Sequence, residues 1–404
     1  MPASPRSSPP RAAPPLLFAA LLLLGACVAE APEPDCAPHT SALSSSAMVT
    51  ARQGRFWLGS TPFNFLGTNL YYAVEASQRG QLDQVEAVFD EAAAMGVSVV
   101  RIWAFNTDPR SPEIIHSGPD AIDEAGLVAL DRVLEAARAR GLRLILTLTN
   151  HWTDYGGLDA YGAWEGLSDR AAMLQSPRVR DHLTRFALTL AERVNTLSGV
   201  AYNQDPAIFG WEIINEPRCP GCSPSLMADF LLAVADDLRI ADPNHLIGVG
   251  DEGFQGQEGV DVRLHARSGA FDWVSVHVWP QSWTSLSAPS GDQRLSEARA
   301  AALGRRWIAQ GAQVARAAGL PLIIGEMGWP SWAGSPIEQA SLVSAWLDEA
   351  RRQQAGGAML WMLVDPGRPD YDGYAIAARR HPAMRAVLCG FAPRERAPEA
   401  RETP

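Results

Sequence analysis

Eight short runs of apolar, largely β-branched residues recur along the chain, and each has the length of a β-strand. Segments with apolar residues at helical spacing lie between most of these runs. Strands that alternate with helices pair in parallel, and eight such units predict a single (β/α)8 TIM barrel of the α/β class. The predicted strands lie near residues 64–69, 98–104, 143–149, 207–214, 245–250, 272–278, 321–326 and 357–364, and the clearest predicted helices are Gln81 to Met95, Gly126 to Arg140, Pro177 to Leu197, Ser225 to Ile240 and Ile337 to Gln353.

The start of the chain has a different pattern, in which two arginines precede the apolar run from Leu16 to Leu24. This run is too short to span a bilayer, which takes about 20 apolar residues, and it predicts an export signal. The segment Leu24-Gly25-Ala26-Cys27 resembles the lipobox of bacterial lipoproteins, which implies lipidation of Cys27. The alternative is simple secretion after cleavage near Ala26.

These patterns divide the chain into four parts. Residues 1–27 are the predicted lipoprotein-type signal, and residues 28–48, rich in Ala, Pro and Ser, are a flexible tether. Residues 49–392 form the barrel domain, and residues 393–404 form a flexible tail. We therefore expect an exported protein at the bacterial cell envelope that meets the membrane only through its N-terminal lipid.

Charge and tryptophan content narrow the choice of partner. A formal net charge of -11 argues against nucleic acid or an anionic membrane surface as partner, whereas a neutral polymer remains compatible. The 13 tryptophans exceed what a core usually needs, and their flat apolar rings suit stacking on sugar faces, although they also serve as packing. The sequence contains no sign of an oligomer, so we expect a monomer.

The cysteines predict disulfides. Without Cys27, four cysteines remain, and an even number in an exported protein favours disulfide pairing. The short loop from Cys219 to Cys222 favours a local bridge, which leaves Cys36 and Cys389 to join the two ends of the domain. A redox site or half a zinc site at Cys219 and Cys222 is a weaker alternative, and we expect neither a metal nor an organic cofactor.

Two of the predicted strands end in a glutamate. The run Trp211-Glu212-Ile213-Ile214-Asn215-Glu216-Pro217 ends in an Asn-Glu pair, and Pro321-Leu322-Ile323-Ile324-Gly325-Glu326-Met327-Gly328-Trp329 ends in a second glutamate beside tryptophan. Two such carboxylates are the minimum equipment of a glycoside hydrolase. Taken singly, each could be an ordinary polar residue at a strand end, and we interpret Glu212 as a structural residue within its strand.

Further polar and aromatic residues lie at the same strand ends. Active sites of (β/α)8 barrels lie at the carboxyl ends of the strands, so these residues should meet at one end of the barrel. Each has a structural alternative: an interior ion pair for Arg101, a buried histidine for His277 and core packing for Trp361. The candidates are Arg101 and Trp103 on the second run, Asn150 and Trp152 after the third, Asn215 and Glu216 on the fourth, His277 and Trp279 on the sixth, Glu326 on the seventh and Trp361 on the eighth.

With its Asn215-Glu216-Pro217 motif and Glu326, the chain resembles glycoside hydrolase family 5. Within that family it is similar to the endo-β-1,4-mannanases over roughly residues 50 to 365. The narrower resemblance rests on Arg101-Ile102-Trp103-Ala104-Phe105-Asn106, Thr149-Asn150-His151-Trp152-Thr153-Asp154-Tyr155-Gly156-Gly157, Asn215-Glu216-Pro217-Arg218-Cys219-Pro220-Gly221-Cys222, Asn244-His245-Leu246 and Gly250-Asp251-Glu252-Gly253.

The resemblance implies a role for each carboxylate and its neighbours. Glu216 is expected to be the general acid/base, with a raised pKa. Glu326 is expected to be the nucleophile, kept ionised by Arg101. Asn215 is expected to bind the sugar 2-hydroxyl.

The resemblance also assigns the aromatic residues of the cleft. Trp361 is expected to form the floor of the cleavage subsite, with Trp103 packed beside it and a cis peptide after Trp361. Trp152 and Arg218 match residues that contact the leaving-group side.

One position departs from the family pattern. The family usually has His-x-Tyr on the sixth strand, whereas this chain has His277-Val278-Trp279. An indole N–H donates a hydrogen bond but accepts none, so the support of Glu326 is expected to differ. We thus predict a retaining endo-β-1,4-mannanase that acts on neutral mannan-type polysaccharide. The alternatives are a β-1,4-glucanase of the same family and a noncatalytic polysaccharide-binding lipoprotein.

Overall fold

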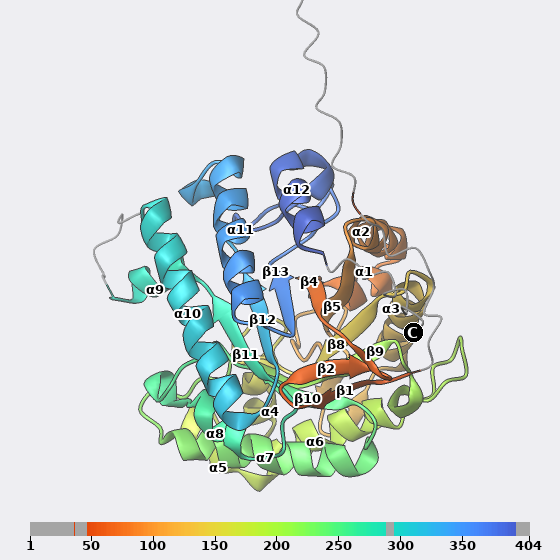
Figure 1. The fold of residues 1–404 in the computed structure, drawn as a ribbon. Helices are drawn as coiled ribbons and strands as arrows, with labels where there is room; N and C mark the ends of the chain where they lie inside the picture. Colours follow the sequence, from red (N-terminus) through yellow and green to blue (C-terminus); the bar gives the residue numbers. More distant parts are fainter. Residues whose placement is uncertain (1–35, 37–46, 288–294, 393–404) are drawn as a thin grey trace, which may run out of the picture. The chain divides into compact units, whose positions relative to one another are not determined.

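Eight parallel strands form one curved sheet in the computed structural model, which describes residue 36 and residues 47–287 and 295–392. The strands follow the order β10, β9, β8, β5, β4, β13, β12, β11 around the sheet. The two end strands, β10 and β11, also contact each other, so the sheet curls into a nearly closed barrel, and the predicted (β/α)8 fold is confirmed (Figure 1). The strands are β4 (Phe65–Asn69), β5 (Val97–Trp103), β8 (Arg143–Thr147), β9 (Ile208–Asn215), β10 (Leu246–Gly250), β11 (Val274–Val278), β12 (Leu322–Met327) and β13 (Gly357–Leu360).

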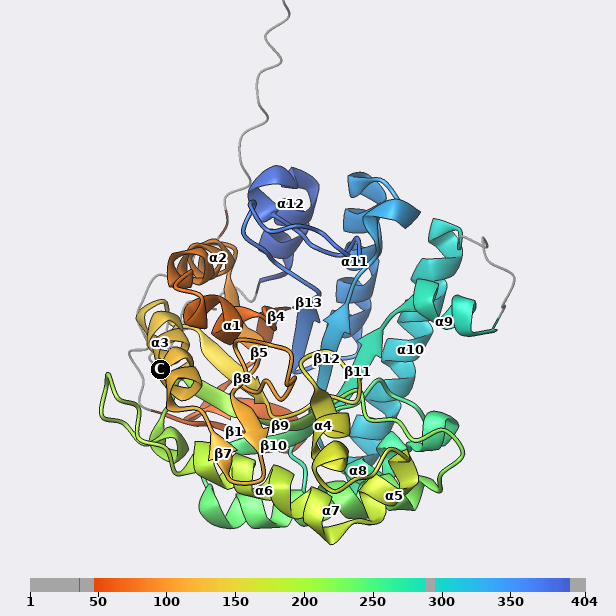
Figure 2. The same ribbon diagram turned by 180° about the vertical axis from the view of Figure 1, so that it is seen from behind.

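Helices surround the barrel on its outer side (Figures 1 and 2). Several begin at side chains that accept a backbone N–H, such as Asp123 before α3 and Ser335 before α11, where Glu338 completes a capping box. The helices are α1 (Ala73–Gln78), α2 (Leu82–Ala94), α3 (Glu124–Ala139), α4 (Gly157–Trp164), α5 (Arg170–Gln175), α6 (Pro177–Ala191), α7 (Pro224–Ala241), α8 (Val262–Arg267), α9 (Pro280–Ser287), α10 (Glu297–Ala318), α11 (Pro336–Arg352) and α12 (Pro382–Phe391).

Helix α6 and the eighth strand end several residues before their predicted ends. Helix α6 ends at Ala191, six residues before the predicted end at Leu197. The side chain of Asn195 accepts hydrogen bonds from the backbone N–H groups of Leu197 and Ser198, and this local turn competes with the helix. The eighth strand ends at Leu360, so Trp361 lies just beyond it.

An apolar cluster fills the amino-terminal end of the barrel. A small antiparallel sheet covers this end, formed by β1 (Val49–Arg52), β2 (Arg55–Leu58) and β3 (Thr61–Pro62). Phe209 lies within 5.1 Å of Phe56 and 5.3 Å of Phe65, measured between ring centroids. We call this set the basal cluster: Val49, Phe56, Phe65, Val99, Ile145, Phe209, Leu246, Trp273, Ile323 and Met359.

Both predicted disulfides are present. Cys219 is bridged to Cys222, and Cys36 is bridged to Cys389, which joins positions 353 residues apart. No helix within the described ranges is both long and apolar enough to cross a membrane. The predicted signal with Cys27, most of the tether and the tail from residue 393 lie outside the described residues.

Candidate active site

The candidate residues from the sequence meet at the carboxyl end of the barrel. Here they surround a cleft of about 460 Å³. Arg101 and His277 do not line the cleft; each is at most 1% exposed and contacts the glutamates from below. The predicted residues that line the cleft are Trp103, Asn150, Trp152, Asn215, Glu216, Arg218, Trp279, Glu326 and Trp361.

Glu216 and Glu326 face each other across this cleft. One oxygen of each carboxylate and a ring nitrogen of His277 all lie within 4.8 Å of one another. His277 Nδ1 is 2.7 Å from Glu216 Oε1 and 3.4 Å from Glu326 Oε2. A separation of about 5 Å is typical of retaining glycoside hydrolases, because direct attack leaves no space for a water between the carboxylates.

Glu216 is held by donors on both of its carboxylate oxygens. It directly follows β9 with φ 46°, a left-handed conformation that few non-glycine residues adopt, and its N–H donates to the Gly250 carbonyl. The indole N–H of Trp152 donates to Oε2 at 2.6 Å, and His277 contacts Oε1. The backbone and two side chains therefore fix the direction of this carboxylate.

Glu326 is held by Arg101 and Trp279. Arg101 Nη1 donates to Glu326 Oε1 at 2.7 Å, and the Trp279 indole donates to Oε2 at 3.2 Å. Glu212, inside β9, binds the Nη2 atom of the same guanidinium at 2.6 Å. Glu212 thus has the structural role expected from the sequence: it fixes Arg101, which in turn contacts Glu326.

Asn215 and Asn150 extend this network toward the cleft. Asn215 Oδ1 accepts from Arg101 Nη2 at 2.5 Å, and its amide nitrogen donates to Asn150 Oδ1 at 3.0 Å. Asn69 at the end of β4 accepts from Arg101 Nη1 at 3.0 Å. Buried polar groups that are fully bonded in this way form a rigid site.

The protonation preferences of the two glutamates are opposite to the expectation from the sequence. Burial raises the pKa of Glu216, but the hydrogen bonds from His277 and Trp152 outweigh it and lower this pKa to about 2. Burial raises the pKa of Glu326 even though His277 and Arg101 oppose it. Burial also disfavours charge on His277, yet Glu326 and Glu216 raise its pKa. In the free site the proton is therefore favoured on His277 rather than on Glu216.

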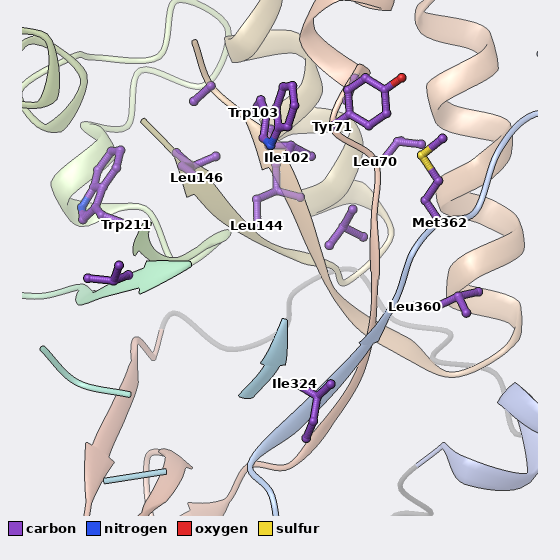
Figure 3. Close-up of a cluster of buried hydrophobic side chains, with 14 of the residues drawn as sticks. Leu70, Tyr71, Ile102, Trp103, Leu144, Leu146, Trp211, Ile324, Leu360 and Met362 are labelled. Atoms are coloured by element: carbon purple, nitrogen blue, oxygen red, sulfur yellow. The ribbon is translucent and has the colours of Figure 1, made fainter. Parts of the chain in front are cut away.

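An aromatic group forms one wall of the cleft. Tyr71 is stacked on Trp361 with ring centroids 5.6 Å apart, and it lies 5.0 Å from Trp103. Figure 3 shows Tyr71 and Trp103 as neighbours within the cluster of buried side chains. The predicted neighbours Trp361 and Trp103 are thus joined through a third ring. The peptide bond between Trp361 and Met362 is cis, as the family resemblance implied.

Arg218 lies beside the acid/base candidate but is paired with another residue. Its Nε and Nη2 atoms both donate to Glu252 at 2.6 Å, and its guanidinium lies 4.9 Å from the Trp152 ring centre. The disulfide between Cys219 and Cys222 follows it directly. Arg218 lines the cleft as predicted, although most of its hydrogen-bonding capacity is directed at Glu252.

Several residues of the cleft were not assigned a role from the sequence. Tyr71 lies two residues after the end of the first barrel strand. The other candidates were identified by the same kind of position just after a strand, so the sequence could also have indicated Tyr71. Residues in loops without periodicity give no comparable signal. The residues that were missed are Tyr71, Asp154, Tyr155, Glu252, Ser282, Trp283, Tyr371, Asp372 and Tyr374.

Glu216, His277 and Glu326 are also the three residues, within the ranges that the structure describes, whose donor atoms are spaced for a metal ion. Their oxygens already accept hydrogen bonds from Arg101 and the two indoles, and the guanidinium offsets part of the carboxylate charge. The expectation of a site without a metal or an organic cofactor stays a prediction.

A (β/α)8 barrel with two buried glutamates at its carboxyl end has the architecture of a glycoside hydrolase. The profile of the family described as GH family 5 beta-mannosidase-like matches residues 46–335. The chain belongs to this family.

Similar proteins carry mannanase names. A putative mannan endo-1,4-beta-mannosidase 5 of rice is 32% identical over 86% of this chain and 76% of the relative. Mannan endo-1,4-beta-mannosidase A of Podospora anserina is 27% identical over 84% of this chain and 89% of the relative. The solved endo-1,4-beta-mannanase of Rhizomucor miehei matches with a TM-score of 0.75 and 26% identity over 86% of this chain and 98% of that chain.

Proposed function

We propose that this enzyme is an endo-β-1,4-mannanase that cleaves internal β-1,4-mannosidic bonds with retention of configuration. The observation that carries this proposal is the close approach of Glu216 and Glu326, which each have a carboxylate oxygen within 4.8 Å of the other. The mannan-acting names of the relatives supply the substrate class. A net charge of -11 suits a neutral polysaccharide rather than an anionic one.

In the first step Glu326 attacks the anomeric carbon. Its carboxylate oxygen forms the ester bond while the glycosidic C–O bond breaks, and the leaving oxygen takes a proton from Glu216. In the second step Glu216 takes a proton from water, the water oxygen bonds to the anomeric carbon, and Glu326 is released as a carboxylate. Both steps place the positive charge of the transition state near ionised oxygens.

The proton for the first step comes from His277 in this proposal. In the free site Glu216 is ionised and the pKa of His277 is raised, with 2.7 Å between their donor and acceptor atoms. A sugar bound against Glu216 removes water and favours its neutral form. The proton then moves along the hydrogen bond from Nδ1 to the carboxylate before the leaving oxygen departs.

The remaining residues position the chain of sugars. Asn215, oriented by Arg101 and Asn150, binds the 2-hydroxyl at the cleavage subsite. Trp361 forms its floor, with Trp103 beside it across Tyr71. Trp152 and Arg218, which lie against each other, contact the sugar on the leaving-group side. The Trp152 indole also donates a hydrogen bond to the acid/base carboxylate of Glu216.

Hydrolysis assays on β-mannan and on β-1,4-glucan test the substrate class. Release of new reducing ends from mannan supports the proposal, cleavage of glucan alone supports a glucanase, and binding without cleavage supports a noncatalytic protein. Glu326→Ala is expected to abolish hydrolysis and keep binding, because the cleft itself remains. Retained hydrolysis would reject Glu326 as nucleophile.

Azide tests the role of Glu216. In Glu216→Ala the vacated space admits azide, which is expected to react with the glycosyl-enzyme formed from an aryl glycoside with a good leaving group. The product should be a glycosyl azide of retained configuration, and an azide of inverted configuration contradicts the assignment.

We also propose that the enzyme is exported as a monomer and anchored through a lipid on Cys27. The support is the Leu24-Gly25-Ala26-Cys27 segment and two disulfides that suit an oxidising compartment. Residues 1–26 are then removed and Cys27 becomes the N-terminus, residues 28–48 tether the barrel domain of residues 49–392, and residues 393–404 form a tail. Mass spectrometry of the mature protein tests this: an acylated N-terminal Cys27 is expected, and an unmodified N-terminus after Ala26 contradicts it.

A further inference from the structure

Two large aromatic side chains lie exposed at one rim of the cleft. Tyr371 is 68% exposed and lines the cleft, and Trp332 is 64% exposed. The indole N–H of Trp332 donates to the Asp372 carbonyl at 3.1 Å, and its ring lies against Gly373, whose φ of 88° suits glycine. We call Tyr371 and Trp332 the rim aromatics.

The loop that carries Tyr371 is held by many short contacts. Asp370 Oδ1 accepts the N–H groups of Gly373 and Ala375, and Asp372 Oδ1 accepts that of Tyr374. The N–H of Ser331 donates to the Gly373 carbonyl at 2.6 Å, which joins this loop to the segment that carries Trp332. An exposed ring on such a fixed loop is preorganised for a ligand and loses little freedom when it binds.

Tyr371 is continuous with the floor of the cleavage subsite. Its hydroxyl lies 3.3 Å from the Tyr71 hydroxyl, and Tyr71 is stacked on Trp361. Arg368 Nη2 also donates to the Tyr71 hydroxyl, at 3.4 Å. The aromatic surface of the cleft therefore continues from Trp361 through Tyr71 to the rim.

The position of this rim in the barrel defines which part of the sugar chain it faces. Tyr371 follows β13, and Glu216 and Arg218 follow β9. Four steps separate these strands in the sheet order, so they lie on opposite sides of the eight-stranded barrel. Because the leaving group lies on the side of Glu216, the rim aromatics face the glycone side, which is the part of the chain that stays bonded to Glu326.

Resting on the proposed function, we propose that the rim aromatics form a sugar subsite on the glycone side, beyond Trp361. The Tyr371 ring offers an apolar face to the C–H groups of a neutral sugar. The carboxylates of Asp372 and Asp154, which also line the cleft, flank it and accept hydrogen bonds from sugar hydroxyls. Trp332 extends the surface outward, so its sugar lies further from the cleaved bond.

Kinetics on mannooligosaccharides of increasing length test the subsite. Tyr371→Ala is expected to lower kcat/KM for mannohexaose about tenfold, which corresponds to about 1.4 kcal/mol, and to lower it less for mannotriose. Cleavage of end-labelled mannohexaose should also shift so that fewer sugars lie on the glycone side. Trp332→Ala should show a smaller loss, confined to the longest substrates.

Two further variants separate stacking from structural effects. Tyr371→Phe keeps the ring but loses the hydroxyl contact to Tyr71, and it is expected to retain most of the activity. Ile240→Ala, which removes an 82% exposed apolar side chain at the end of α7, should match the parent. If Tyr371→Phe loses as much as Tyr371→Ala, or if Tyr371→Ala affects all substrate lengths equally or not at all, the subsite is rejected. Failure of the parent to cleave mannan rejects the proposed function instead.

Discussion

The two ends of the barrel are formed by the same eight strands, yet the side chains that fill them differ in chemistry. At the amino end the basal cluster is apolar, and Phe209 packs against Phe56 and Phe65. At the carboxyl end the same strands present buried charges, with Arg101, Glu212 and Glu326 each no more than 3% exposed. Phe209 and Glu212 belong to one strand, β9, and are three residues apart.

This difference shows where the fold gains stability and where it supports chemistry. Burial of apolar rings stabilises the folded chain, whereas burial of charges carries a desolvation cost that only good pairing offsets. The charges at the carboxyl end therefore need close partners, and Arg101 supplies them by contacting Glu212, Glu326, Asn69 and Asn215. Stability and activity should respond differently to substitutions at the two ends.

Two buried arginines give the largest contrast. Arg101→Met leaves Glu212 and Glu326 as buried carboxylates without their partner, so we expect the free energy of unfolding to fall by about 3–5 kcal/mol. Hydrolysis should fall at least about a hundredfold, since Glu326 and Asn215 lose their common donor. Urea denaturation and mannan hydrolysis measure both effects, and a variant with parental activity contradicts the role of Arg101.

Arg143 provides the matched control at the amino end. It is 4% exposed, burial lowers its pKa to about 10, and Nε and Nη2 have no hydrogen-bond partner among the described residues. Its guanidinium lies 5.6 Å from the centre of the Phe63 ring. Arg143→Met should keep activity. Its free energy of unfolding should either fall by less than about 1 kcal/mol or rise, because the substitution removes a buried charge that is costly to desolvate.

The basal cluster should respond in the opposite way. Phe209→Ala removes a ring that packs against Phe56, Phe65 and Trp273, and the remaining cavity is expected to cost about 3–5 kcal/mol of stability. Hydrolysis by the folded fraction should match that of the parent, measured well below the lowered melting temperature. A loss of kcat in fully folded variant protein means that the two ends are coupled.

The two ends also differ in how far the sequence predicts them. Each strand is a local apolar run, and Glu216 and Glu326 lie where such a run stops, so the fold and the meeting of these two glutamates in one cleft can both be predicted. The hairpin over residues 49–62 and the loop that carries Tyr371 lack such runs. The direction of the pKa shift at Glu216 depends on His277 and Trp152, residues far apart in the chain whose hydrogen bonds exist only after folding.

The charges at the carboxyl end make stability depend on pH. The pKa of Glu216 is lowered from 4.5 to about 2, so its contribution is present above pH 4.5 and is lost as the pH falls toward 2. The pKa of His277 is raised above 6.5, so its contribution is present below pH 6.5 and is lost as the pH rises through the folded value. We expect the stability difference between the parent and His277→Gln to be largest between these limits.

Denaturant titrations at several pH values measure this difference. Each unit by which folding raises the pKa of His277 adds about 1.4 kcal/mol to the free energy of unfolding. This contribution should disappear at alkaline pH. Phe209→Ala serves as the reference from the amino end, because no titrating group is removed and its stability loss should not follow this profile. A difference between parent and His277→Gln that is constant with pH contradicts the proposed charge on His277.

Among the substitutions that touch Glu326, Trp279→Tyr should give the smallest effect, at the position where the chain departs from the family pattern. Its indole N–H donates to Glu326 at 3.2 Å, and its ring lies 6.1 Å from that of Trp361. Tyrosine also offers one donor, so Trp279→Tyr should retain activity within about tenfold, or ~1.4 kcal/mol, with a shifted pH profile. Trp279→Ala loses both the donor and the apolar wall and should cost far more. If Trp279→Ala cleaves mannan as fast as the parent, Glu326 is sufficiently held by Arg101 alone, and the indole contributes packing rather than catalysis.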